Sequence, residues 1–148
     1  MTTKEHLDKK YCCFYASDFH LEMILLPYIE KKIYKDKFVI FTEENLSESM
    51  KVLLNRTNLN QDEKRLMLDL NWDKKDSKNF SKEDLDESTI IINGSIKYIS
   101  TINEEINKIN PRKINIIDCY NINDNNLEPE IIQEKYDDIL NSKTYKKM

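Results

Sequence analysis

Short apolar runs alternate along this chain with longer segments in which apolar residues recur every three or four positions. Four of the runs are continuous, which is typical of strands that are buried on both faces of a parallel sheet. These predicted strands cover residues 11–16, 37–42, 89–93 and 113–119. Helical spacing follows each of them, so the pattern predicts that strands and helices alternate.

The starts of the first three predicted helices carry capping signals. Ser17 and Asp18 precede a helix over about 19–34, where their side chains can accept hydrogen bonds from the first free N–H groups. The spacings Asn45-x-x-Glu48 and Asn60-x-x-Glu63 are capping boxes, and they predict the starts of two further helices.

Prolines and isoleucines shape the remaining helices. Pro27 lies inside the first helix and predicts a kink or a late start. Isoleucines at helical spacing predict an amphipathic helix over 96–109, which Asn110-Pro111 should end. Pro129 lies near the first turn of a last helix, whose apolar side extends from Ile131 to Leu140.

Strands that alternate with helices predict a parallel sheet covered on both faces. We therefore expect residues 1–148 to form a single α/β domain, a small three-layer doubly wound sandwich with about four mainly parallel strands and helices on both faces. Outside the sandwich we expect a polar N-terminal arm at 1–10, an exposed charged loop at about 73–88 that Phe80 pins, and a frayed basic tail at 141–148.

Glycine is scarce, and this changes which ligands are plausible. The 148 residues include one glycine, Gly94. Loops that cradle phosphate on backbone amides need several glycines, because a Cβ does not fit there. The loop after the first strand instead carries Asp18, whose carboxylate would repel a pyrophosphate at the helix N-terminus. The Rossmann-like pattern thus comes without a phosphate-binding glycine loop, and we expect no nucleotide cradle.

Charge and cysteine usage narrow the setting. The formal net charge is −4, which argues against non-specific binding to nucleic acid. We expect no membrane contact, because no apolar run reaches 18 residues, and no secretory signal, because residues 1–10 are polar. Cys12, Cys13 and Cys119 are an odd number with two adjacent members, which suits a reducing cytoplasm better than a disulfide framework.

Polar residues gather where the predicted strands end. Ligands of doubly wound sheets bind outside the carboxyl ends of the strands, so these residues are candidates for a site. The ligand-binding candidates are Ser17, Asp18, His20, Thr42, Glu43, Asn93, Gly94, Ser95, Asp118 and Tyr120. Helix caps use the same residue types, so the pattern also has a purely structural explanation. Gly94 marks the strand end where a backbone can approach a ligand closely.

The segment Ala16-Ser-Asp-Phe-His-Leu21 resembles the strand-one motif of calcineurin-like metallophosphoesterases, in which an Asp-x-His pair binds a metal. That family also needs a Gly-Asp, a Gly-Asn-His turn and two later histidines. The other histidine of this chain is His6, and Asn93-Gly94-Ser95 is not a Gly-Asn-His turn. A two-metal hydrolase cannot be assembled from these residues, so the sequence argues against the family.

A single divalent ion bound by Asp18, His20, Glu43 and Asp118 is the remaining metal hypothesis. We expect instead that Asp18 caps the helix and that His20 packs in its first turn, so no metal or other cofactor is predicted. Two functions stay open. The first, favoured because no complete catalytic set is visible, is a cytoplasmic, non-enzymatic α/β module that binds a partner protein or a small polar ligand. The alternative is a small hydrolase or transferase that uses an acidic cleft, with or without a metal, at the strand carboxyl ends.

Overall fold

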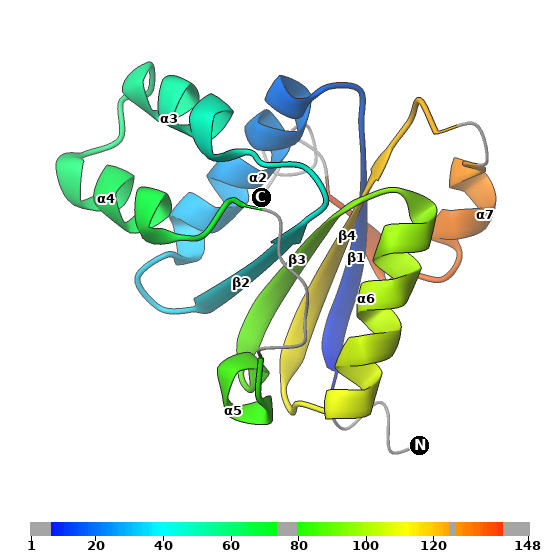
Figure 1. Ribbon diagram of the computed structural model, residues 1–148. Coiled ribbons are helices and arrows are strands. Elements are labelled where there is room, and N and C mark those ends of the chain that lie inside the picture. The colour runs from blue at the N-terminus through cyan, green and yellow to red at the C-terminus, as the bar shows by residue number, and fades with distance from the viewer. Residues whose placement is uncertain (1–6, 74–79, 125–126, 141–148) are drawn as a thin grey trace.

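The computed structural model describes residues 7–73, 80–124 and 127–140 (Figure 1). Its five strands are parallel and form one sheet in the order β2-β3-β4-β1-β5. This confirms the predicted α/β sandwich, with five strands instead of about four. The strands are β1 (Leu7–Tyr15), β2 (Lys37–Thr42), β3 (Ser88–Gly94), β4 (Ile114–Asn121) and β5 (Asp138–Ile139).

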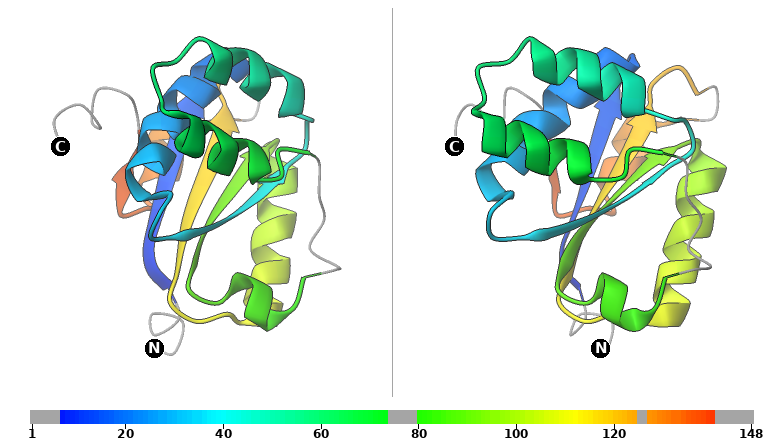
Figure 2. Two further views of the ribbon diagram at one scale, coloured as in Figure 1. Left: turned by 90° about the vertical axis from the view of Figure 1, so that its left-hand side faces the viewer. Right: turned by 60° about the vertical axis from the view of Figure 1, so that its left-hand side comes forward.

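Helices cover both faces of the sheet (Figures 1 and 2). On one face lie α2 (Asp18–Lys32), α3 (Ser47–Asn55) and α4 (Gln61–Asp69). On the other lie α6 (Ile96–Ile109) and the short α7 (Pro129–Gln133), together with α5 (Lys82–Leu85), whose buried Leu85 belongs to the same core. None of the helices in the described ranges has the length and apolar character needed to cross a membrane.

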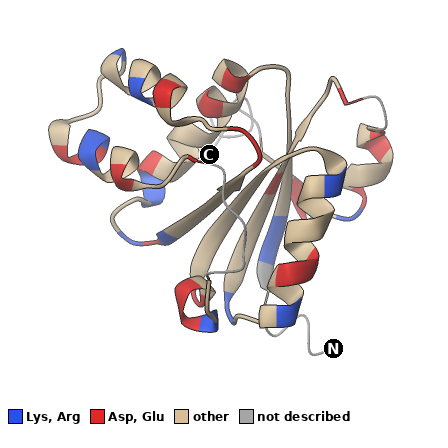
Figure 3. Cartoon of the chain, in the orientation of Figure 1, with Lys and Arg blue, Asp and Glu red and all other residues tan. Residues whose placement is uncertain are grey.

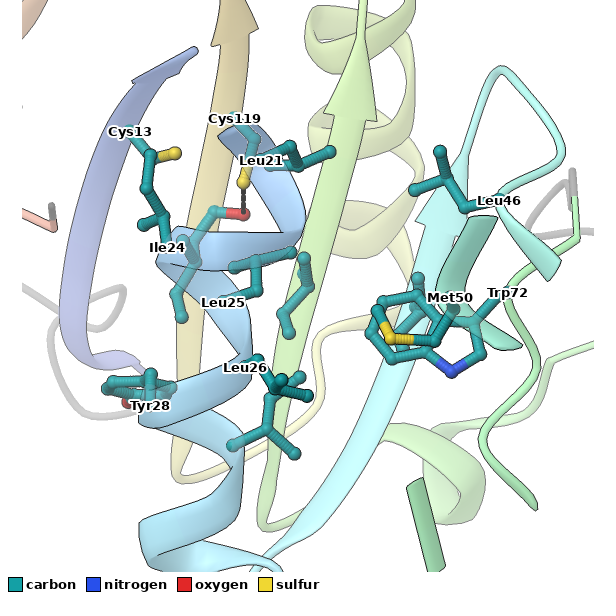
Figure 4. Close-up of a cluster of buried hydrophobic side chains, with 14 of the residues drawn as sticks. Cys13, Leu21, Ile24, Leu25, Leu26, Tyr28, Leu46, Met50, Trp72 and Cys119 are labelled. Atoms are coloured by element: carbon teal, nitrogen blue, oxygen red, sulfur yellow. Dashed lines mark hydrogen bonds between the residues drawn. The ribbon is translucent and has the colours of Figure 1, made fainter. Parts of the chain in front are cut away.

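Each central strand contributes side chains to two cores, one on each face of the sheet, because successive side chains of a strand point to opposite faces. Cys12 belongs to the core on the α6 side of the sheet, whereas the adjacent Cys13 belongs to the core on the α2 side. Figure 4 shows the α2 side, where Leu21 and Leu25 fill the space above the sheet and Trp72 closes its far end. The indole N–H of Trp72 donates to the Met67 carbonyl at 2.8 Å, so this buried polar atom is satisfied.

Local capping signals predict some helix starts and not others. Ser17 caps α2, and the Asn60-x-x-Glu63 box caps α4 with both of its hydrogen bonds. The capping box predicted at Asn45 and Glu48 is wrong, because α3 begins without a side-chain cap. The Asn45 side chain instead accepts from the Ser47 N–H in a turn. Pro27 lies inside α2, which begins at Asp18 and therefore has no late start.

Two of the segments that were expected to lie outside the sandwich contain regular structure. Residues 7–10, assigned to the polar arm, are the first part of β1. The expected loop contains α5, which a Ser81–Asp84 capping box starts. Phe80 does pin this segment, because its ring packs edge-on against Phe41 with the centroids 5.1 Å apart. The rest of these predictions falls outside the described residues, at 1–6, 74–79 and 141–148.

The C-terminal part of the chain differs most from the expectation. The last helix, α7, ends at Gln133 instead of continuing to Leu140, and the chain then forms β5 against β1. The N–H groups of Asp137 and Leu140 donate to the carbonyls of Lys10 and Cys12, each at 2.8 Å. Pairing with an otherwise open strand edge thus overrides the helical spacing of this segment.

Candidate functional site

A pocket of about 260 Å³ opens at the carboxyl edge of the sheet. Because β1 and β2 lead into helices on one face while β3 and β4 lead into helices on the other, the chain leaves the sheet here in opposite directions. This is the usual ligand position in doubly wound sheets. The pocket is lined by Tyr15, Glu43, Glu44, Asn93, Gly94, Ser95, Asn121, Asn123 and Asp124.

Asn93 is the key polar residue of this pocket, and it is 2% exposed. Its Nδ2 donates to Thr42 Oγ1 at 3.0 Å, and Thr42 Oγ1 donates to the Glu44 carbonyl at 2.7 Å. The single hydroxyl proton of Thr42 is thereby used, so its oxygen can only accept from Asn93. This network fixes the orientation of the amide, with Asn93 Oδ1 turned away from Thr42.

The amide oxygen of Asn93 is left without a hydrogen-bond donor. Across the described ranges it is the one buried side-chain oxygen or nitrogen that lacks a partner. An unsatisfied buried acceptor costs about 1–3 kcal/mol, and folded proteins contain few of them. Because Asn93 also lines the pocket, an N–H or O–H donor that reached Oδ1 from there would remove this cost.

The N-terminus of α6 forms another wall of the pocket. Two carboxylates already balance the positive end of its helix dipole. Glu43 Oε1 accepts from the Ser95 N–H at 2.8 Å, and Asp124 Oδ2 accepts from the Ile96 N–H at 3.4 Å. Ser95 Oγ, the N-cap of α6, accepts from the Tyr98 N–H at 3.1 Å. Two carboxylates thus lie where a bound anion would interact with the positive end of the helix dipole.

Gly94 is the last residue of β3 instead of a turn residue, and its lack of a side chain has a clear cause. A Cβ at this position would lie 2.7 Å from Tyr98 Cδ2 and 2.8 Å from Glu43 Oε1. Both distances are shorter than any normal contact, so only glycine lets the Glu43 side chain reach the start of α6. The close approach expected at Gly94 is therefore made by Glu43 and Tyr98.

The charge around the pocket is negative. Three carboxylates, those of Glu43, Glu44 and Asp124, line it, and no lysine or arginine does among the residues that the structure describes. Figure 3 shows the acidic residues on the loops that follow β2 and β4. Burial raises the pKa of Tyr15, and the nearby Cys119 and Glu44 raise it further, so its hydroxyl keeps its proton at neutral pH.

The loop after β4 is held in place by β1. The Ile122 N–H donates to the Tyr15 carbonyl at 2.8 Å, and Asn123 Nδ2 donates to the Ala16 carbonyl at 3.3 Å. Asn121 Oδ1 accepts from the Asn123 N–H at 2.8 Å, which tightens the turn between them. These contacts give the pocket a wall that the sequence analysis missed.

Half of the predicted candidates do come together, since Glu43, Asn93, Gly94 and Ser95 line the pocket and Thr42 supports it from below. Ser17, Asp18 and His20 do not line it. Ser17 Oγ accepts from the His20 N–H at 3.1 Å, and His20 Nδ1 accepts from the Ala16 N–H at 2.9 Å. These residues close the turn between β1 and α2, and the cap is Ser17 instead of Asp18. His20 is exposed, so it does not pack in the first turn as expected.

The structure also corrects the place of Asp118 and Tyr120, which lie within β4 and not at its end. Asp118 is 1% exposed beneath α6. Its carboxylate accepts from the Tyr136 hydroxyl at 2.6 Å and from Asn103 Nδ2 at 3.1 Å, and Lys10 Nζ lies 3.9 Å away. The Tyr120 and Tyr136 hydroxyls are hydrogen-bonded to each other at 2.6 Å. Burial raises the pKa of Asp118, which the Lys10 ammonium lowers only in part.

The four candidate metal ligands therefore lie in three different places. Asp18 and His20 are at the start of α2, Glu43 contacts the start of α6, and Asp118 lies inside the other core. Within the described ranges, no group of three or more His, Cys, Asp or Glu side chains is placed to hold a metal ion.

Comparison of this chain with known protein families, with curated proteins and with solved structures gives no match in any of the three. The functional inference therefore rests on the pocket and its chemistry.

Proposed function

We propose that this chain is a non-enzymatic, cytoplasmic α/β binding module that holds a small polar ligand in the strand-end pocket. The observation that carries the proposal is the orphaned Oδ1 of Asn93, a buried acceptor on a residue that lines this pocket. The pocket volume of about 260 Å³ lies just below the range of about 300–1,000 Å³ typical of small-molecule sites, so the ligand is small.

The separation of the candidate acids and His20 supports binding over catalysis. A hydrolase or transferase built on Asp18, His20, Glu43 and Asp118 would need these groups within reach of one substrate. In the structure they lie on opposite faces of the sheet or at different loops. The cytoplasmic location is supported by the three cysteines, all of which are free and buried.

The proposal is tested by thermal unfolding in the presence of small polar compounds of three kinds: neutral amides and polyols, organic cations, and anions. A compound that binds only the folded state raises the midpoint by mass action, by about 2.7 kcal/mol of stability at one hundred times its Kd. We expect at least one class to raise the midpoint of the wild type and to leave Asn93→Leu unmoved. The proposal fails if no compound acts, or if both proteins respond equally.

A further inference from the structure

We infer that the ligand of this pocket is a small organic cation that carries N–H donors, such as a primary alkylammonium ion. The inference deepens the proposed function and rests on it. Its basis is the juxtaposition of an unpartnered buried acceptor, Asn93 Oδ1, with the carboxylates of Glu43, Glu44 and Asp124.

The hydrogen-bonding chemistry of the pocket favours a ligand that donates. Asn93 Oδ1 can only accept, and its orientation is fixed by the Thr42 hydroxyl. Three donors at the start of α6, the N–H groups of Ser95, Ile96 and Tyr98, already bond to Glu43, Asp124 and Ser95 Oγ. A ligand that brings its own N–H groups therefore finds acceptors here, whereas a ligand that brings only acceptors meets donors that are largely occupied.

The charge of the pocket selects a cation among such donors. An anion would face three carboxylates, and the helix N-terminus that could have balanced them is occupied. Glu43 is committed to Ser95, whereas the Glu44 side chain is exposed at the edge of the pocket. We assign recognition of one N–H group to Asn93 and attraction of the positive charge chiefly to Glu44.

A metal ion fits the site less well than an organic cation. Oxygen-binding cations need several carboxylate or carbonyl ligands at 2.0–2.6 Å around one point. Among the described residues, no three His, Cys, Asp or Glu side chains are placed to hold a metal ion, and Glu43 and Asp124 already accept from backbone N–H groups.

The single glycine provides a direct probe of this pocket. Labelling with ¹⁵N-glycine gives one backbone amide signal, that of Gly94, which lies in the pocket wall. We would titrate four compounds and follow this signal: n-butylammonium, N,N,N-trimethylbutylammonium, butanamide and inorganic phosphate. The second keeps the charge and removes the N–H donors, and the third keeps N–H donors and removes the charge.

We expect n-butylammonium to shift the Gly94 signal in a saturable way. The trimethyl analogue and butanamide should each bind about tenfold more weakly than n-butylammonium. The trimethyl analogue loses the N–H donors, and butanamide loses the positive charge that strengthens their hydrogen bonds. Phosphate should cause no saturable shift. The inference is overturned if the trimethyl analogue or butanamide binds as tightly as n-butylammonium, or if phosphate binds.

Two matched variants separate local contact from overall charge. Glu44→Gln removes a carboxylate of the pocket, and Glu48→Gln removes an exposed one on α3, which is paired with Lys51 at 3.6 Å and does not line the pocket. Glu44→Gln should weaken n-butylammonium binding about threefold, the scale of a partly screened ion pair, and Glu48→Gln should leave it unchanged. Equal effects of the two variants would contradict a role for Glu44 in the site.

The outcomes also distinguish this inference from the proposed function. Suppose that n-butylammonium does not bind, but a neutral compound raises the thermal unfolding midpoint of the wild type and not that of Asn93→Leu. The proposed binding site is then supported, and the inference of a cationic ligand is refuted. If neither the cation nor any other compound acts on the wild type, both proposals fall together.

Discussion

Replacing Asn93 by leucine is predicted to stabilise the protein while removing its ability to bind ligand. Leucine has the same branching at Cγ, so it fills the same space without polar atoms. The change removes the unpartnered Oδ1, whose burial costs about 1–3 kcal/mol, and loses the Nδ2 bond to Thr42, which contributes about 0.5–1.5 kcal/mol. The net expectation is a gain of about 1 kcal/mol in the free energy of unfolding.

Thr42→Val is the matched control, because Thr42 pairs with Asn93 in register on the neighbouring strand. Valine keeps the β-branched shape and removes the hydroxyl. The Glu44 carbonyl then loses its donor and Asn93 Nδ2 loses its acceptor, while Oδ1 stays unpaired. We expect a loss of about 2 kcal/mol, the cost of one hydrogen bond plus a stranded buried donor.

Urea unfolding followed by tryptophan fluorescence measures both changes. Trp72 is the only tryptophan of the sequence and is 2% exposed, so its emission reports the loss of the core. The two variants should move the urea midpoint in opposite directions at a constant slope. If Asn93→Leu lowers stability by more than about 1 kcal/mol, the amide oxygen is already satisfied in the ligand-free protein, and the reasoning is refuted.

Three further experiments test other parts of the structure. Ser17→Ala should cost about 1 kcal/mol in urea unfolding and Asp18→Ala clearly less, because Ser17 is the cap of α2; the reverse order would contradict the assignment. Burial raises the pKa of Glu22 above its usual 4.5, so its stabilising contribution is complete below the unfolded-state pKa and is lost as pH rises through the folded-state pKa. The stability of the wild type relative to Glu22→Gln should therefore fall from acid toward neutral pH in urea titrations, and a constant difference would count against this. Tyr136→Phe removes a bond to the buried Asp118 carboxylate and should cost about 1.5–3 kcal/mol, with faster hydrogen exchange along β5; unchanged exchange there would speak against the contact.

The layers of the fold could be predicted because their signals are local. The continuous apolar runs around Ile40 and Ile91 belong to strands that are buried on both faces, and the periodic isoleucines of α6 cover one of those faces. The Asn60 capping box is likewise complete within four residues. Such signals need no knowledge of distant partners.

The misplaced elements depend on long-range partners. The segment at Asp138 pairs as a strand only because β1 offers an open edge there, and its apolar spacing is also compatible with a helix. Lys10 belongs to β1, and its charge lies 3.9 Å from the buried Asp118 of the adjacent β4. No pattern within either segment indicates that contact.

The candidate site could be predicted in part for the same reason. Glu43, Asn93 and Ser95 were found because parallel strands end at one edge, whatever their order. The apolar run predicted a fourth strand that ends at Cys119, with Asp118 and Tyr120 at its edge, but β4 continues to Asn121. The wall that follows this true end was therefore missed, although its asparagine-rich sequence is a usable turn signal.

The most direct measurement is a crystal structure of the protein with the tightest ligand of the compound series. We expect the ligand to lie in the strand-end pocket with an N–H or O–H donor about 2.7–3.2 Å from Asn93 Oδ1. A ligand bound elsewhere, with Asn93 Oδ1 hydrogen-bonded only to water or to another protein group, would contradict this expectation.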